Sequence, residues 1–196
     1  MEKILNKVQK PLLWSFLIVS ALVLVTSLCY MTNYIYIVPD SGSTCEEVFH
    51  TLNKTNNMIL YSAIVAIVAF AVMCIVGNKY RKKYYIANLV VGVLAAGVAL
   101  VMAIINIILN ISAIGAINSN IAGIAEEIWF YYPSLENASG VALNLGFSYF
   151  ALIVAILSAL IYALNLAFIV VKFIIGRSTK NAIENVDINL SESVGE

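Results

Sequence analysis

The sequence predicts an all-α integral membrane protein whose four transmembrane helices form a bundle. The 196-residue chain is 62% hydrophobic and only 11% charged, whereas soluble domains average about 45–50% apolar and about 25% charged residues. The chain also contains four long uncharged apolar runs, and about 20 helical residues cross a hydrocarbon core of roughly 30 Å. This composition excludes a soluble globular enzyme, a disordered protein and a nucleic-acid-binding protein.

The predicted spans are, in chain order, 12–31, 58–77, 84–109 and 147–175. Lipid offers the backbone no hydrogen-bond partner, so runs of this length are expected to be helices. The first run is twenty residues long, which exceeds the roughly 7–15 apolar residues of a signal peptide. We therefore interpret it as a retained span. Pro11 then falls in its first turn, where the missing N–H leaves no hydrogen bond unmade.

Basic residues predict the orientation of the spans. Ten of the eleven lysines and arginines lie in 1–11, 78–83 and 172–196, and only Lys54 lies on the other side. Because positive residues are retained on the cytoplasmic side, both termini and the basic loop 78–83 are expected in the cytoplasm, with 176–196 as a mobile acidic tail. The formal net charge of zero then divides into +5 inside and −5 outside. The plasma membrane is the expected location.

Two outer loops are predicted, 32–57 and 110–146, and the second is expected to be partly helical. Isoleucines recur there at steps of three and four, which is typical of an amphipathic helix. They are Ile111, Ile114, Ile117, Ile121, Ile124 and Ile128. In the favoured arrangement, spans three and four extend outward as a helical hairpin that ends near Pro133. In the other, 111–128 bends at Gly115 and Gly123 and lies in the membrane interface.

Small and polar residues share one face of the third and fourth spans. Small residues let helices approach closely, and asparagines supply hydrogen bonds between helices, so this face is expected to pack against other helices or to line a pore. The residues are Asn88, Gly92, Ala99, Asn106, Asn110, Ser158, Tyr162 and Asn165. The four span cores contain no ionisable residue except Lys172 near one end, which argues against a carrier that uses an intramembrane carboxylate.

Covalent modification is possible at two kinds of position on the predicted outer side. Asn53 and Asn137 begin Asn-x-Thr and Asn-x-Ser triplets, which are acceptors for glycosylation. Cys29 and Cys45 are candidates for a disulfide in an oxidising exterior, with unpaired thiols as the alternative.

The sequence predicts neither a catalytic nor a metal nor a cofactor site. Glu46, Glu47 and His50 are interpreted as solvated charges of a loop rather than as metal ligands. The expected function is that of a non-enzymatic multi-pass membrane protein acting by association, as an accessory or scaffold subunit. The alternative is an oligomeric channel or small-solute transporter whose pathway is lined by the polar face of span four. Expected partners are the lipid bilayer and either other membrane subunits or further copies of the chain, with no nucleic acid.

Overall fold

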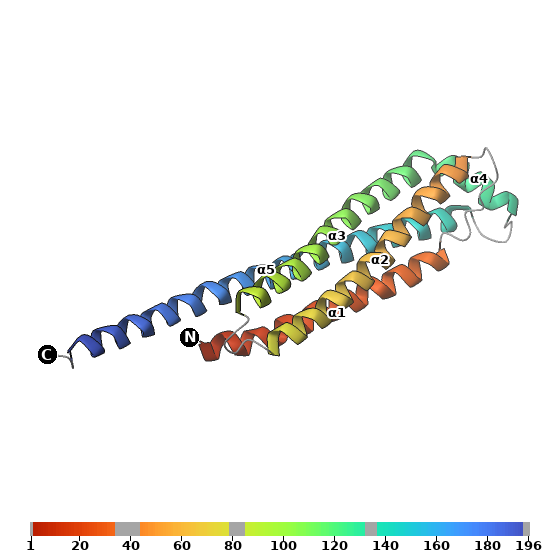
Figure 1. Cartoon of the computed structure of the whole chain (residues 1–196). Helices are drawn as coiled ribbons and strands as arrows, with labels where there is room; N and C mark the ends of the chain where they lie inside the picture. Colours follow the sequence, from red (N-terminus) through yellow and green to blue (C-terminus); the bar gives the residue numbers. More distant parts are fainter. Residues whose placement is uncertain (1, 34–43, 79–84, 132–136, 194–196) are drawn as a thin grey trace.

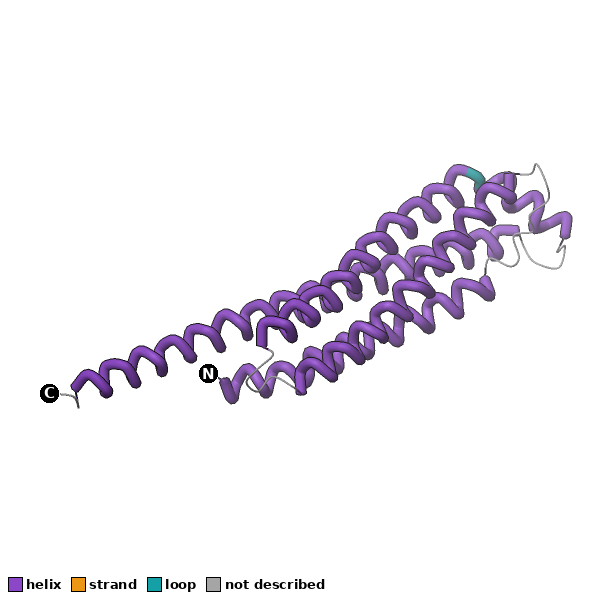
Figure 2. Tube along the Cα trace, viewed as in Figure 1, coloured by secondary structure: helices purple, strands orange, loops and turns teal. Residues whose placement is uncertain are grey.

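A computed structural model describes residues 2–33, 44–78, 85–131 and 137–193, and every one of these residues except Asn120 is helical (Figure 2). The helices are α1 (Glu2–Asn33), α2 (Thr44–Asn78), α3 (Tyr85–Ser119), α4 (Ile121–Tyr131) and α5 (Asn137–Ser193). Figure 1 shows α1, α2, α3 and α5 side by side, with both termini at one end and α4 at the other. The predicted all-α bundle is confirmed.

Four of these helices are long and apolar enough to cross a membrane. Their apolar segments are Lys7–Met31, Cys45–Ile75, Ile86–Ser119 and Leu145–Ile175. The main helix contacts form a closed ring in which α1 packs on α2, α2 on α3, α3 on α5, and α5 on α1. Short α4 packs chiefly on α5. Each long helix therefore has two main neighbours and leaves an outer face that lipid can cover.

Buried residues recur in all four long helices at alternating steps of three and four. In α2 they are Cys45, Val48, Leu52, Thr55, Ile59, Ser62, Ala66, Ala69 and Met73. In α3 they are Gly92, Ala96, Ala99, Ala103, Asn106, Asn110, Ala113 and Ile117. This heptad period is that of left-handed coiled coils, in which one seam keeps facing the partner helix. The same seam therefore runs through most of the length of the bundle.

Two hydrophobic clusters share this seam but differ in side-chain size. The bulky core comprises Val23, Tyr30, Cys45, Val48, Leu52, Ile59, Ala63, Ala113, Ile117, Ile124, Ala151 and Val154. The alanine core comprises Phe16, Val19, Ala66, Ala69, Met73, Ala96, Ala99, Ala103 and Tyr162. Because Ile124 belongs to α4, the bulky core lies toward the α4 end of the bundle, and the alanine core lies toward the termini (Figure 1).

Helix α2 begins at Thr44, well before the predicted span 58–77. Residues 44–57, which the sequence analysis assigned to the loop 32–57, form four helical turns in front of the predicted span. Their asparagines and threonines are typical of loops. Burial of Cys45, Val48 and Leu52 on one face outweighs that preference, since helices in proteins are stabilised mainly by packing of an apolar face.

The segment 110–146 is also more helical than predicted, and its isoleucines do not form one stripe. Span three continues as α3 to Ser119, but the chain turns at Asn120, where the Asn120 N–H donates to the Ile117 carbonyl. The described isoleucines do not share one buried face, so the predicted continuous stripe was wrong. Ile114, Ile117 and Ile124 are buried, whereas Ile111 and Ile121 are 57% and 45% exposed. Gly115 and Gly123, where the alternative arrangement placed bends, both lie within helices, and the non-helical residue between α3 and α4 is Asn120.

The helices at both ends of the chain extend beyond the predicted spans. Helix α1 begins at Glu2, so Pro11 lies in the helix interior and not in its first turn. Helix α5 continues through the predicted tail to Ser193, giving 57 residues, or roughly 86 Å at about 1.5 Å per residue. A helix that is already formed extends without repeating the costly nucleation step, and 177–193 contains neither proline nor glycine to stop it. The basic loop 79–83 and Pro133 lie outside the described residues.

Candidate functional site in the polar interior

Polar side chains are buried inside the bundle beside its two apolar cores, while many large apolar side chains are exposed on the outside. The buried polar residues are Ser20, Thr26, Ser27, Thr55, Asn56, Ser62, Asn106, Asn110, Ser148, Ser158 and Asn165, joined by Tyr30 and Tyr162. Large apolar side chains such as Leu94 and Leu160 are 61% and 59% exposed. Water-soluble proteins bury polar groups sparingly, so this distribution is that of a bundle surrounded by lipid, where polar residues face one another.

The structure brings together most of the residues predicted to pack helices or to line a pore. Gly92 is buried, and Ala99, Asn106, Asn110, Ser158, Tyr162 and Asn165 are each at most 4% exposed. Asn88 is half-buried at the start of α3. All the buried members face the interior of their own bundle. A polar face of α5 turned toward neighbouring copies of the chain is therefore not what the structure contains.

Hydrogen bonds tie α1 to α5 at three levels. The Tyr162 hydroxyl and Ser20 Oγ are 2.9 Å apart, and the Tyr162 ring lies with its centroid 4.3 Å from that of Phe16. Closer to α4, the Tyr30 hydroxyl is 3.0 Å from Ser148 Oγ. Near the termini, Lys172 Nζ donates to Gln9 Oε1 at 2.5 Å. These contacts fix the register of two antiparallel helices along the length of the bundle.

Helix α2 is tied to both of its neighbours. Ser27 Oγ on α1 donates to Asn56 Oδ1 at 2.9 Å. On the other side, Asn106 Nδ2 of α3 donates to Ser62 Oγ at 2.5 Å, and Thr55 Oγ1 lies 3.5 Å from the Leu109 carbonyl oxygen. Such bonds between membrane helices contribute about 0.6 kcal/mol each on average. Their effect is therefore chiefly to select one packing of the helices.

Ser158 and Asn165 do not join α5 to another helix by a hydrogen bond in the described part of the chain. Ser158 Oγ donates to the Ala155 carbonyl at 2.8 Å, and Asn165 Nδ2 donates to the Ile161 carbonyl at 2.9 Å. Both bonds stay within α5 and satisfy the polar group locally. Among the three predicted polar residues of span four, Tyr162 alone supplies a hydrogen bond to another helix.

Sequence reasoning missed several residues that form hydrogen bonds between helices, including Ser20 and Ser62, the partners of Tyr162 and Asn106. Ser20, Ser27, Asn56, Ser62 and Ser148 stand in spans one, two and four or in the segment assigned to the first outer loop. The signal that could have identified two of them is the heptad, because Ser62 and Ser148 occupy seam positions of their helices. A seam residue that is polar needs a partner on the facing helix.

Two amide oxygens in this interior have no hydrogen-bond partner among the described residues. They are Oδ1 of Asn106 and Oδ1 of Asn110, in residues that are 2% and 0% exposed. The Asn110 amide group is otherwise engaged, since its Nδ2 donates to the Asn106 carbonyl at 2.8 Å. An unsatisfied buried acceptor costs about 1–3 kcal/mol, so these two atoms are the least satisfied polar groups described in the bundle.

The predicted modification sites lie toward the α4 end. Asn53 is half-buried in α2, and Thr55 of the same triplet is fully buried with its hydroxyl bonded to the Thr51 carbonyl. Asn137 is the first residue of α5, and its side chain is outside the described part. Cys29 is half-buried near the end of α1, and Cys45 is buried at the start of α2. The glycosylation sites and the Cys29–Cys45 disulfide stay predictions.

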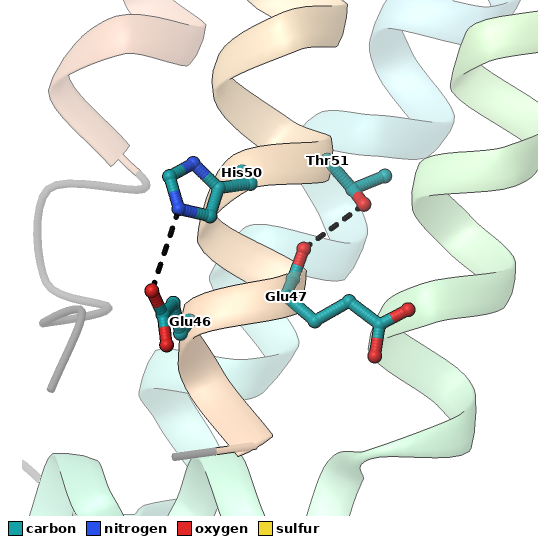
Figure 3. A network of polar contacts seen from close by, with 4 residues as sticks. All are labelled: Glu46, Glu47, His50 and Thr51. Carbon is teal, nitrogen blue, oxygen red and sulfur yellow. Dashed lines mark hydrogen bonds and ion pairs between the residues drawn. The ribbon is translucent and has the colours of Figure 1, made fainter. Parts of the chain in front are cut away.

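The charged residues at the start of α2 form an exposed network. Figure 3 shows His50 beside Glu46, with Nε2 3.8 Å from Oε1, while the Glu47 carboxylate points away from both. Thr51 Oγ1 donates to the Glu47 carbonyl at 3.0 Å. Nowhere in the described residues do three histidine, cysteine, aspartate or glutamate side chains gather as a metal site would require.

Comparison of the chain with protein-family models, with curated protein sequences and with solved structures finds no match. The chemistry of the site therefore has to be judged from its own geometry. The described interior offers hydroxyl and amide groups that hydrogen-bond to one another, together with two amide oxygens that have no partner there.

Proposed function

We propose that this chain is a non-enzymatic multi-pass membrane protein that acts by association, as an accessory or scaffold subunit of a membrane complex. The observation that carries the proposal is the use made of the polar interior. Ser20, Ser27, Ser62 and their partners hold neighbouring helices together. Polar groups committed to such bonds build a rigid bundle rather than a wide pathway.

The proposed arrangement in the plasma membrane places both termini in the cytoplasm and the α4 end outside. The distribution of lysine and arginine supports this orientation. Exposed apolar residues follow α3 as far as Ile111, whereas Asn118 and Ser119 at its end are exposed and polar. On α2, Glu47, His50 and Lys54 are exposed in the same way. These residues support a helical cap that stands above the membrane and is formed by the start of α2, the end of α3, and α4.

The cytoplasmic part of α5 is the proposed assembly element. Figure 1 shows α5 extending beyond the other helices at the end where the termini lie. The heptad buried in α5 includes Tyr162 and Asn165, and its continuation along the sequence falls on Ile183, Val186 and Leu190. Apolar residues at successive heptad positions are typical of helices that pair with another helix.

A channel or small-solute transporter is the second candidate function. The unpartnered oxygens of Asn106 and Asn110 favour it, because a pathway for a polar solute needs groups that replace its hydration. Since Ser158, Tyr162 and Asn165 face inward, such a pathway would run through one bundle and not between copies of the chain.

The mass of the native complex, measured after extraction in mild detergent, separates the two functions. The accessory role predicts a defined complex with other membrane subunits, at fixed stoichiometry. The triple variant Ile183→Asn, Val186→Asn and Leu190→Asn should release the chain from that complex while the bundle stays folded. Conduction of a solute after reconstitution of the chain without other subunits, as a monomer or as a homo-oligomer, would overturn the accessory role and support the channel.

A further inference from the structure

We propose that Asn106 and Asn110 bind an internal water molecule between the helices of the bundle, with their Oδ1 atoms as the acceptors. Both residues lie on α3 one helical turn apart and are almost completely buried. The site is independent of the proposed association, since it depends only on the interior of one chain.

The orientation of each amide follows from its neighbours. The Ser62 hydroxyl donates to the Ile59 carbonyl at 2.8 Å, so it can only accept from Asn106. The group of Asn106 that faces Ser62 is therefore Nδ2, the donor. Likewise, Asn110 faces the Asn106 backbone carbonyl, which accepts only, so Nδ2 must lie there as well. Flipping either amide would bring two acceptors together. Both Oδ1 atoms are consequently left to accept a hydrogen bond from another group.

The residues of α5 at this level supply no donor. The position of a Cβ built on Gly92 lies 3.8 Å from Ile169 side-chain atoms, which sets the register of antiparallel α3 and α5. Fourteen residues further along α3 and fourteen back along α5, Asn106 is level with Ala155, and Asn110 with Ala151. Both alanines are buried. The alanine side chain is a single methyl group, which is small and cannot donate a hydrogen bond.

A water molecule fits this site better than a cation. Two neutral amide oxygens offer no charge to balance a cation, and the predicted spans 12–31, 58–77, 84–109 and 147–175 contain neither aspartate nor glutamate. Transfer of an uncompensated ion into a low-dielectric interior is strongly unfavourable. Water is neutral and has two O–H donors, and buried waters typically bond to polar groups that lack other partners.

Water-to-side-chain cross-relaxation in NMR spectra of the full chain in lipid nanodiscs tests the proposal. The probe is the solvent itself, and the Nδ2 protons of Asn106 and Asn110 are assigned by their loss in Asn106→Leu and Asn110→Leu. We expect a cross-peak between the Asn110 Nδ2 protons and a water molecule whose residence time is long compared with surface water. In Asn110→Leu, the corresponding cross-peak at Asn106 should be lost.

Two controls separate a bound water from other sources of the signal. Ser62→Ala removes a hydroxyl whose exchange could relay magnetisation, and the Asn110 cross-peak should persist in it. Ser158→Ala removes a buried hydroxyl that bonds within α5, and it should leave both cross-peaks unchanged. If Asn110→Leu does not fold, the proposal is still tested by the Asn110 Nδ2 cross-peak to water in the wild-type protein and in Ser62→Ala.

The proposal is overturned if the wild-type Asn110 Nδ2 protons show cross-peaks to aliphatic protons only. It is also overturned if the Asn106 and Asn110 side-chain signals shift when sodium chloride replaces choline chloride at constant ionic strength. That second result would assign the two oxygens to a sodium ion.

Discussion

The bulky core and the alanine core are packed by residues of different size along one heptad seam. In α2 the seam changes from Val48 and Leu52 at the α4 end to Ala66 and Ala69 toward the termini. Lipid chains are as apolar as the helix surface, so helices in a membrane gain stability from close approach of small residues. In the proposed arrangement the α4 end stands in water, where removal of large apolar side chains from solvent contributes stability. The proposed arrangement therefore predicts a different source of stability at each end of the seam.

The largest expected effect is at the bulky core. Leu52→Ala removes a side chain that is 1% exposed and leaves a cavity, so it should lower the free energy of unfolding by about 2–5 kcal/mol. Equilibrium unfolding in mixed micelles of mild detergent and dodecyl sulfate measures it, with exposed Lys54→Ala as the control. An effect no larger than that of the control would mean that this end is not held by apolar packing.

The next effect is of the opposite kind and is expected at the alanine core. Ala99 is 1% exposed, so Ala99→Leu should force the helices apart and lower the free energy of unfolding by about 1–3 kcal/mol. The control is Val98→Leu, because Val98 is 50% exposed on the outer face. Unchanged stability of Ala99→Leu in the same unfolding assay would contradict close packing in this core.

Gly92→Ala asks whether the alanine core also needs a glycine. A Cβ at Gly92 would lie 3.8 Å from Ile169, an ordinary contact, so the helices should not move. The free energy of unfolding should rise by about 0.5–1 kcal/mol, because glycine in a helix interior is less favourable than alanine. The control is Gly97→Ala, where a Cβ would meet nothing within 4 Å. It should raise the free energy of unfolding by a similar amount without a new contact. If Gly92→Ala lowers the free energy of unfolding and Gly97→Ala does not, the backbones of α3 and α5 approach too closely at Gly92 for a methyl group.

The smallest effect concerns a hydrogen bond next to the alanine core. Tyr162→Phe keeps the ring contact with Phe16 but removes the hydroxyl that is 2.9 Å from Ser20 Oγ. The expected loss is about 0.6 kcal/mol, the average for such bonds in a membrane protein. Tyr149→Phe, at a 47% exposed position, is the control. A double-mutant cycle with Ser20→Ala should give a coupling energy of the same size. A coupling energy of zero would show that the Ser20–Tyr162 hydrogen bond does not stabilise the bundle.

The four spans and most of the interior face could be predicted from the sequence because apolar length and small-residue spacing are local signals. The set from Gly92 to Asn165 was predicted as one face of each helix, and the structure buries nearly all of it. The part before span two could not be recognised by composition. Its asparagines and threonines resemble a loop, while Cys45, Val48 and Leu52 fall on the heptad of the span itself.

Hydrogen-bond partners could not be predicted, because they depend on the register between helices. The pairs Ser20–Tyr162 and Ser27–Asn56 join positions whose separation in sequence carries no signal of contact. The turn at Asn120 was missed for a related reason. The isoleucine spacing predicts one continuous helix, whereas a single non-helical residue, Asn120, divides it, and Ile111 and Ile121 face away from the core.

Depth measurement of spin labels in lipid vesicles tests the central claim most directly, namely that the alanine core lies in lipid and the cap lies in water. Labels at Leu94 and Leu160, which are 61% and 59% exposed, should collide mainly with oxygen, which partitions into lipid. Labels at Asn118 and Ile121, both exposed, should collide mainly with a water-soluble nickel reagent. Oxygen-dominated collisions at Asn118 and Ile121, equal to those at Leu94, would contradict the claim and place α4 in the membrane.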